Sequence, residues 1–89
     1  MINIEEILSK FEKDVLVNIN KDNFMKIINF LINEKCDFID DIITDYLDLF
    51  TFDYEEFIDK YKKLNFKYDN KLLEKVSSDM NILEEFYII

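Results

Sequence analysis

The sequence contains no glycine, proline, histidine, tryptophan, arginine, alanine or glutamine, and its one cysteine is Cys36. Without glycine, the phosphate-binding loop and the dinucleotide fingerprint are excluded. Without histidine there is no Ser-His-Asp triad and no ordinary proton shuttle near neutral pH. A single cysteine excludes an intramolecular disulfide and the zinc sites built on three or four cysteines. We therefore expect no catalytic residue, no cofactor and no metal.

The size and composition predict one helical domain spanning residues 1–89. Apolar residues make up 49% of the chain, which is enough to drive folding. The first residues have no basic segment followed by an apolar one, and no run approaches the length of a membrane span, so we expect a cytoplasmic protein with Cys36 reduced. Ile, Asn, Lys, Phe and Tyr, which have AT-rich codons, supply 48 of 89 residues and indicate a low-GC bacterium or its phage or plasmid.

Apolar residues recur at helical spacing along nearly the whole chain, and this predicts an all-α fold, a compact bundle of four to five short helices. A first helix is expected from the cap Asn3 to about Val15, and 15–20 is either its frayed end or a short strand. A second helix is expected to begin near Asn20 or Asp22 and to bury one face, made of Phe24, Ile27, Ile28 and Leu31.

Three further starts are predicted from capping residues. Asp37 is expected to cap a helix that runs to Phe50, although the sequence leaves open whether 21–50 is one bent helix or two. Asp53, with Glu56 three residues later, is expected to cap the next helix. A last helix is expected from about Asn70, after a connection at 65–69. The spacing also predicts two i,i+4 ion pairs, Glu56–Lys60 and Asp59–Lys63.

The acidic residues are concentrated in one stretch. Residues 34–59 hold ten acids and one lysine, which accounts for the whole net charge of −9. Like charges one turn apart destabilise a helix, and aspartate is a weak helix former, so this stretch lowers stability. The ten acids are Glu34, Asp37, Asp40, Asp41, Asp45, Asp48, Asp53, Glu55, Glu56 and Asp59.

Two interpretations of this stretch stay open. The charge can simply keep a small apolar domain soluble, and acids near helix N-termini are favourable in their own right. That explanation does not cover Asp45 and Asp48, which are expected late in a helix. The other interpretation is that the acidic edge binds a basic protein surface, with carboxylates one turn apart imitating phosphates. The partner-binding residues expected on this basis are Asp37, Asp41, Asp45, Asp48, Glu55 and Asp59, with Tyr46 or Tyr54 as an anchor.

Other kinds of site are disfavoured by the residues present. A calcium loop needs its glycine and its ligand spacing, and a helical di-iron site needs histidine. Direct binding of DNA or RNA is disfavoured because the chain has no basic patch. An enzyme would need a deep pocket with a perturbed carboxylate. Cys36 is expected to be a buried apolar residue.

In size, acidity, codon usage and lack of catalytic residues, the chain resembles the small acidic inhibitors of phages and mobile elements, of which anti-CRISPR proteins are the best-known group. The resemblance implies a non-enzymatic inhibitor that occupies the nucleic-acid-binding surface of a basic target protein. The chain also resembles the acidic immunity proteins of nuclease bacteriocins, although it lacks their Tyr-Tyr-Pro segment. The alternatives are therefore an immunity protein or antitoxin that neutralises a basic toxin, and a structural protein that forms a homo-oligomer.

Overall fold

The computed structural model describes residues 6, 9 and 20–89, and this part of the chain is all-helical, as the sequence predicts. It contains four α-helices and two 3-10 helices, with no strand among the described residues. The expected first helix and the alternative strand at 15–20 lie almost wholly outside these residues. The elements are α3 (Lys21–Asn33), α4 (Ile39–Asp45), η1 (Leu47–Thr51), α5 (Tyr54–Lys67), α6 (Leu72–Ser78) and η2 (Met80–Tyr87).

Helix α3 follows its sequence pattern closely. The side chain of Asn20 accepts a hydrogen bond from the Asn23 amide at 3.2 Å, which caps the first turn. The four side chains of the expected inner face, Phe24, Ile27, Ile28 and Leu31, are all buried. The Asn20 cap therefore determines where this helix begins, and the amphipathic spacing determines which face it packs.

Residues 21–50 form two α-helices and a 3-10 helix, which answers the question that the sequence left open. Helix α3 ends at Asn33 and is followed by Lys35 in the left-handed region, with φ 63°. The Cys36 amide then bonds back to the Leu31 carbonyl at 3.0 Å, and the chain turns away. The N-cap position of α4 is Phe38, so the expectation that Asp37 caps this helix is wrong.

The expected continuous helix to Phe50 is also wrong, because it stops at Tyr46 (φ −136°, ψ 48°) and resumes as η1. The last expected helix is divided in the same way at Asp79 (φ −149°, ψ 96°), which separates α6 from η2. Both interruptions turn the chain so that a further aromatic side chain reaches the core. Phe50 packs on Phe24 with ring centroids 5.1 Å apart, and Phe86 stacks on Phe57 at 5.2 Å.

A half-buried side-chain amide, that of Asn23, holds the junction between η1 and α5. Asp53 occupies the predicted N-cap position of α5, but its side chain makes no capping hydrogen bond. Instead, Oδ1 of Asn23 accepts a hydrogen bond from the Tyr54 amide at 2.6 Å. The Asn23 side-chain amide also donates to the carbonyl oxygens of Phe52 and, at 3.4 Å, of Phe50. A half-buried residue of α3 thus caps α5 across the fold.

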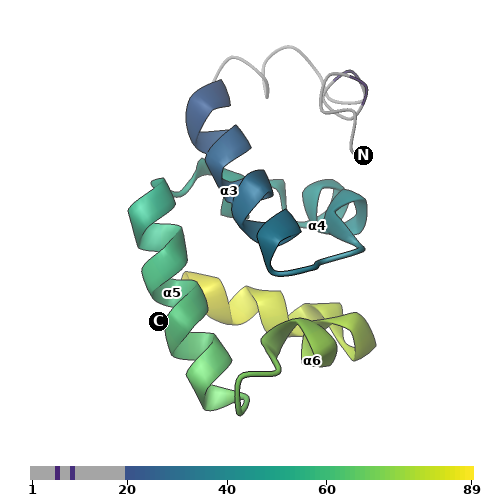
Figure 1. Cartoon of the computed structure of the whole chain (residues 1–89), viewed down its shortest axis with the longest axis vertical. Coiled ribbons are helices and arrows are strands. Elements are labelled where there is room, and N and C mark those ends of the chain that lie inside the picture. Colours follow the sequence, from purple (N-terminus) through teal and green to yellow (C-terminus); the bar gives the residue numbers. More distant parts are fainter. Residues whose placement is uncertain (1–5, 7–8, 10–19) are drawn as a thin grey trace.

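The connection between α5 and α6 is not the expected 65–69, because α5 runs on to Lys67, but it does use polar residues in place of glycine. Asp69 and Asn70 both have positive φ, at 58° and 63°. Aspartate and asparagine tolerate this conformation better than other non-glycine residues. Oδ1 of Asn65 accepts a hydrogen bond from the Leu72 amide at 3.0 Å and so holds the start of α6. Figure 1 shows α6 beside the lower half of α5 after this turn, and the following η2 running back toward α5.

Candidate functional site

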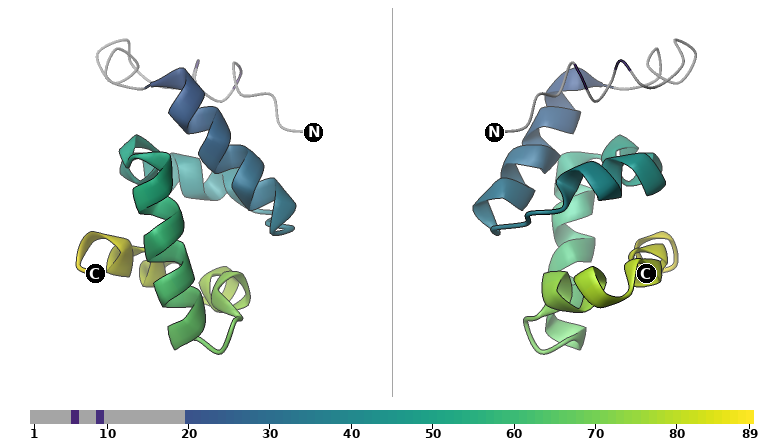
Figure 2. Two further views of the ribbon diagram at one scale, coloured as in Figure 1. Left: turned by 60° about the vertical axis from the view of Figure 1, so that its left-hand side comes forward. Right: turned by 90° about the vertical axis from the view of Figure 1, so that its right-hand side faces the viewer.

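All ten acids of residues 34–59 lie on the surface. Nine of them divide into two groups, one on and around α4 and η1 and the other on α5, and the tenth, Glu34, is the C-cap residue of α3. Figure 1 shows α4 and α5 on opposite sides of α3, and the right-hand view of Figure 2 shows α4 in front and α5 behind. The group on and around α4 and η1 consists of Asp37, Asp40, Asp41, Asp45 and Asp48.

Two tyrosines, Tyr46 at the end of α4 and Tyr87 at the end of η2, lie among several carboxylates. Burial raises the pKa of the half-buried Tyr46 hydroxyl, and the negative charges of Glu84, Asp45 and Asp79 raise it further. Glu84 and Asp79 are far from Tyr46 in sequence, and sequence reasoning missed both. They lie near it because η2 crosses close to the end of α4.

Tyr87 belongs to the same surface. Burial raises the pKa of its hydroxyl, and Asp48, Tyr46 and Glu84 add to that effect. Its ring lies 5.9 Å from that of Phe52. We name the group made of the two tyrosines and the four carboxylates around them the α4–η2 surface; its members are Asp45, Tyr46, Asp48, Asp79, Glu84 and Tyr87.

Asp45 and Asp48 were both expected late in a helix, where negative charge is unfavourable, and this is confirmed for Asp45 alone. Asp45 is the last residue of α4, where the carbonyl groups at the helix end disfavour a negative charge. Asp48, expected late in the same helix, instead lies in the first turn of η1. Asp40 and Asp41 lie in the first turn of α4, where negative charge is favourable. Among the acids of α4 and η1, Asp45 is therefore the one whose position local helix energetics disfavours.

The α5 group has different surroundings. The predicted pair Asp59–Lys63 is present at 3.0 Å. The other predicted pair, Glu56–Lys60, is not an ion pair within the described residues, because Lys60 Nζ donates to the Ile89 carbonyl at 2.6 Å and lies 5.4 Å from the centre of the Phe52 ring. Glu55 is exposed in the first turn, and Tyr54 is half-buried beside the core.

A second carboxylate network lies on the α5 side, and sequence reasoning did not identify it. Glu85 of η2 accepts hydrogen bonds from the Lys67 ammonium and from the Tyr68 hydroxyl. The hydrogen bonds from Lys67 and Tyr68 hold the pKa of Glu85 below its ordinary value. This network joins the end of α5 to η2 and so helps to position the residues that follow.

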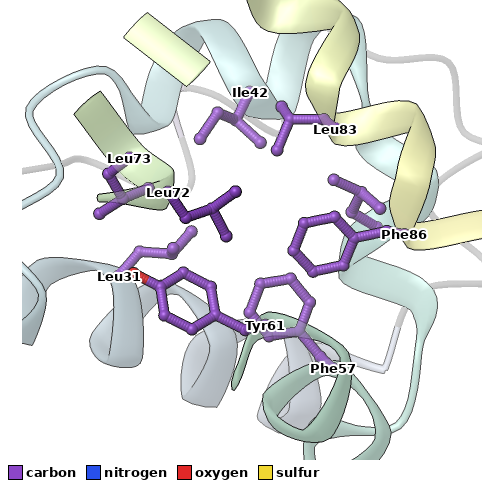
Figure 3. Close-up of a pocket in the computed structure, with 9 residues that line it drawn as sticks. Leu31, Ile42, Phe57, Tyr61, Leu72, Leu73, Leu83 and Phe86 are labelled. Atoms are coloured by element: carbon purple, nitrogen blue, oxygen red, sulfur yellow. The ribbon is translucent and has the colours of Figure 1, made fainter. Parts of the chain in front are cut away.

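The interior holds no site for a polar ligand in the part of the chain that the structure describes. A cavity of about 10 Å³ lies at the centre of the core, where all six helices contribute side chains, and those around it point toward one another in Figure 3. A water molecule needs polar partners that this lining does not offer, so we read the cavity as a packing gap. A surface hollow of about 300 Å³ is lined only by the consecutive residues 36–41.

Reactive or metal-binding groups are not assembled among the described residues. Cys36 is buried, as expected, and burial raises the pKa of its thiol, which disfavours the nucleophilic thiolate. No group of three acidic or cysteine residues in the described part is placed to hold a metal ion. None of its helices has the length and apolar content needed to cross a membrane.

Comparison of the chain with protein-family models, with curated proteins and with solved structures finds no match.

Proposed function

We propose that this protein is a non-enzymatic inhibitor that acts in the cytoplasm of a bacterial cell by binding a basic target protein. In this proposal its acidic face occupies the surface with which the target holds nucleic acid, in the manner of anti-CRISPR proteins. The residues proposed to make the contact are those of the α4–η2 surface, together with Asp37 and Asp41 beside it. Glu55, Asp59 and Tyr54 of α5 form the outlying part of the predicted set.

The observation that carries the proposal is a set of exposed carboxylates that have no lysine partner in the part of the chain that the structure describes. The ion pairs within the described residues are Asp59–Lys63 and Lys67–Glu85, and neither involves α4 or η1. Segment 37–48 has no lysine of its own, and tertiary packing adds Asp79 and Glu84 to its acids. Unpaired like charges repel one another and lower stability, so a basic partner would relieve this repulsion on binding.

The chemistry of the surface suits a partner protein whose own binding site holds the phosphates of nucleic acid. Carboxylates near one another present acceptors to which lysine and arginine side chains can donate, as they do to phosphate oxygens. Tyrosines within such a surface can supply buried area and hydrogen bonds at an interface. Long-range attraction between the acidic face and a basic groove would speed association and weaken as salt screens it.

The proposal is tested with a panel of purified basic nucleic-acid-binding proteins, each loaded with a fluorescent oligonucleotide. The wild-type chain should displace the oligonucleotide from its target, with a potency that falls as salt rises. Reversal of Asp41, Asp45 and Asp48 to Lys should abolish displacement while circular dichroism shows unchanged helicity. Reversal of the exposed acids Asp22, Glu56 and Glu74 changes the net charge equally and is the matched control. Equal displacement by both triple variants would refute the proposal.

The immunity-protein alternative uses the same acidic surface and differs in its target. Basic nuclease toxins are therefore included in the panel. If one of these toxins loses its nuclease activity on binding while the other proteins keep their oligonucleotides, the target is a toxin.

A further inference from the structure

An exposed apolar segment follows directly on the α4–η2 surface. Tyr87, Ile88 and Ile89 are 44%, 80% and 44% exposed, and we name these three residues the apolar tip. Water disfavours such a cluster, and clustered apolar residues on the surface of a small protein commonly mark a contact site. The tip is therefore a second feature, independent of the carboxylates, at the same place on the molecule.

The apolar tip is held by contacts on both sides of the chain. The preceding residue, Phe86, is 1% exposed and stacks on Phe57 in the core. The carbonyl of Ile89 accepts a hydrogen bond from Lys60 Nζ at 2.6 Å. Because the residues before and after it are fixed, Ile88 is presented outward on a supported turn, which lowers the entropy that a partner would have to remove on binding.

Carboxylates border the tip on one side. The negative charges of Asp48 and Glu84 raise the pKa of the Tyr87 hydroxyl, and the Tyr87 ring packs on Phe52. On the other side Lys60 lies over the Phe52 ring and is already engaged with Ile89. An apolar centre with a charged rim is the usual anatomy of a protein interface.

We propose that the apolar tip is the anchor through which the α4–η2 surface docks a basic protein, and that this partner offers an apolar depression flanked by lysine or arginine side chains. The inference rests on the proposed function and adds to it the position of the anchor and the apolar part of the partner. Charge complementarity selects a basic partner over a second copy of this chain. Two copies joined at the tip would bring their carboxylate rims together, each copy with a net charge of −9.

The probes are two synthetic peptides of equal length and charge, one built from lysine and leucine and the other from lysine and serine. Binding of each to the full chain is measured by fluorescence anisotropy. The wild-type chain should bind the leucine peptide at least about tenfold more tightly, because burial of one aliphatic side chain contributes about that factor. Ile88→Ser should remove this preference and leave the affinity for the serine peptide unchanged. Phe66→Ser, which removes an apolar side chain that is 81% exposed on α5, should keep the preference.

The two hypotheses fail separately in this design. A preference that survives Ile88→Ser, or that Phe66→Ser removes equally, overturns the anchor. A dimer that forms with rising concentration in sedimentation and is lost in Ile88→Ser also overturns it, since the occupant would then be a second copy. If reversal of Asp41, Asp45 and Asp48 leaves the affinity for the serine peptide unchanged, the proposed function fails, whatever Ile88→Ser does.

Discussion

Replacement of Asn23 by alanine should destabilise the protein more than replacement of any other polar side chain of α3 by alanine. In the Asn23 side chain, Oδ1 accepts a hydrogen bond from the Tyr54 backbone N–H at 2.6 Å, and Nδ2 donates to the carbonyl oxygens of Phe52 and Phe50. This side chain therefore caps α5 and closes the chain between η1 and α5. Alanine removes all of these contacts and leaves the Tyr54 amide without its capping acceptor.

The magnitude follows from the individual contacts. Loss of a helix-capping acceptor costs about 1 kcal/mol, and loss of the bond to the Phe52 carbonyl costs about 1 kcal/mol more. The contact to Phe50, at 3.4 Å, is too long to add much. The expected loss is about 2 kcal/mol of a total of roughly 4–13 kcal/mol for a chain of this length. The melting temperature should fall by about 8–16 °C.

Urea unfolding followed by circular dichroism measures this loss as a lower midpoint with an unchanged slope. Asn29→Ala is the matched control, because Asn29 is an exposed asparagine of the same helix and alanine there should raise stability by about 0.5 kcal/mol. Hydrogen exchange at the Tyr54 amide should speed up in Asn23→Ala alone. If the two variants unfold at the same urea concentration, the cross-fold cap does not stabilise the protein.

Three further predictions concern single positions. Lys35→Gly should stabilise the protein by about 0.5–1 kcal/mol, because Lys35 has φ 63° and glycine adopts a positive φ without strain. Lys26→Gly, inside α3, should instead cost about 1 kcal/mol. Equal effects of the two substitutions in urea unfolding would contradict this prediction. Burial raises the pKa of Tyr61 to about 12, so the folded state holds the proton more tightly and stability should fall as the pH rises from 10 to 12. Between about pH 9 and pH 11.5, urea unfolding should show a smaller loss of stability for Tyr61→Phe than for the wild type. Equal losses would refute the assignment of this pH dependence to Tyr61. Glu85→Gln should lower the melting temperature at neutral pH, because the charged carboxylate accepts hydrogen bonds from Lys67 and Tyr68. The difference in melting temperature from the wild type should shrink as the pH falls from 4.5 through the lowered pKa of Glu85. A difference that does not change with pH would contradict the role of the Glu85 charge.

Local sequence patterns determined the features that depend on neighbours a few residues apart. The stripe of α3 is buried as its spacing predicts, and Asn20 caps that helix. The Asp59–Lys63 pair forms one turn apart on an exposed face. Asp69 and Asn70 take up the positive φ angles that a chain without glycine must assign to other residues. Each of these features follows from backbone geometry over a single turn.

Helix ends were predicted less well, because competing tertiary contacts decide them. The apolar spacing runs on through Tyr46 and Asp79, but the chain bends at both residues. A 3-10 turn and an α-helical turn place apolar residues at similar intervals, so periodicity does not separate them. The packing of Phe50 on Phe24 and of Phe86 on Phe57 favours the bent course.

The candidate site shows the same division. The concentration of acids in residues 34–59, and their position on the surface, could be predicted from charge and spacing, because isolated carboxylates stay in water. Only the tertiary structure separates the acids of α4 from those of α5, brings Glu84 and Asp79 to Tyr46, and holds the end of η2 through the contacts of Phe86 with Phe57 and of Ile89 with Lys60. The charge of a segment is a property of its residues, whereas the surface that it joins depends on how distant helices cross.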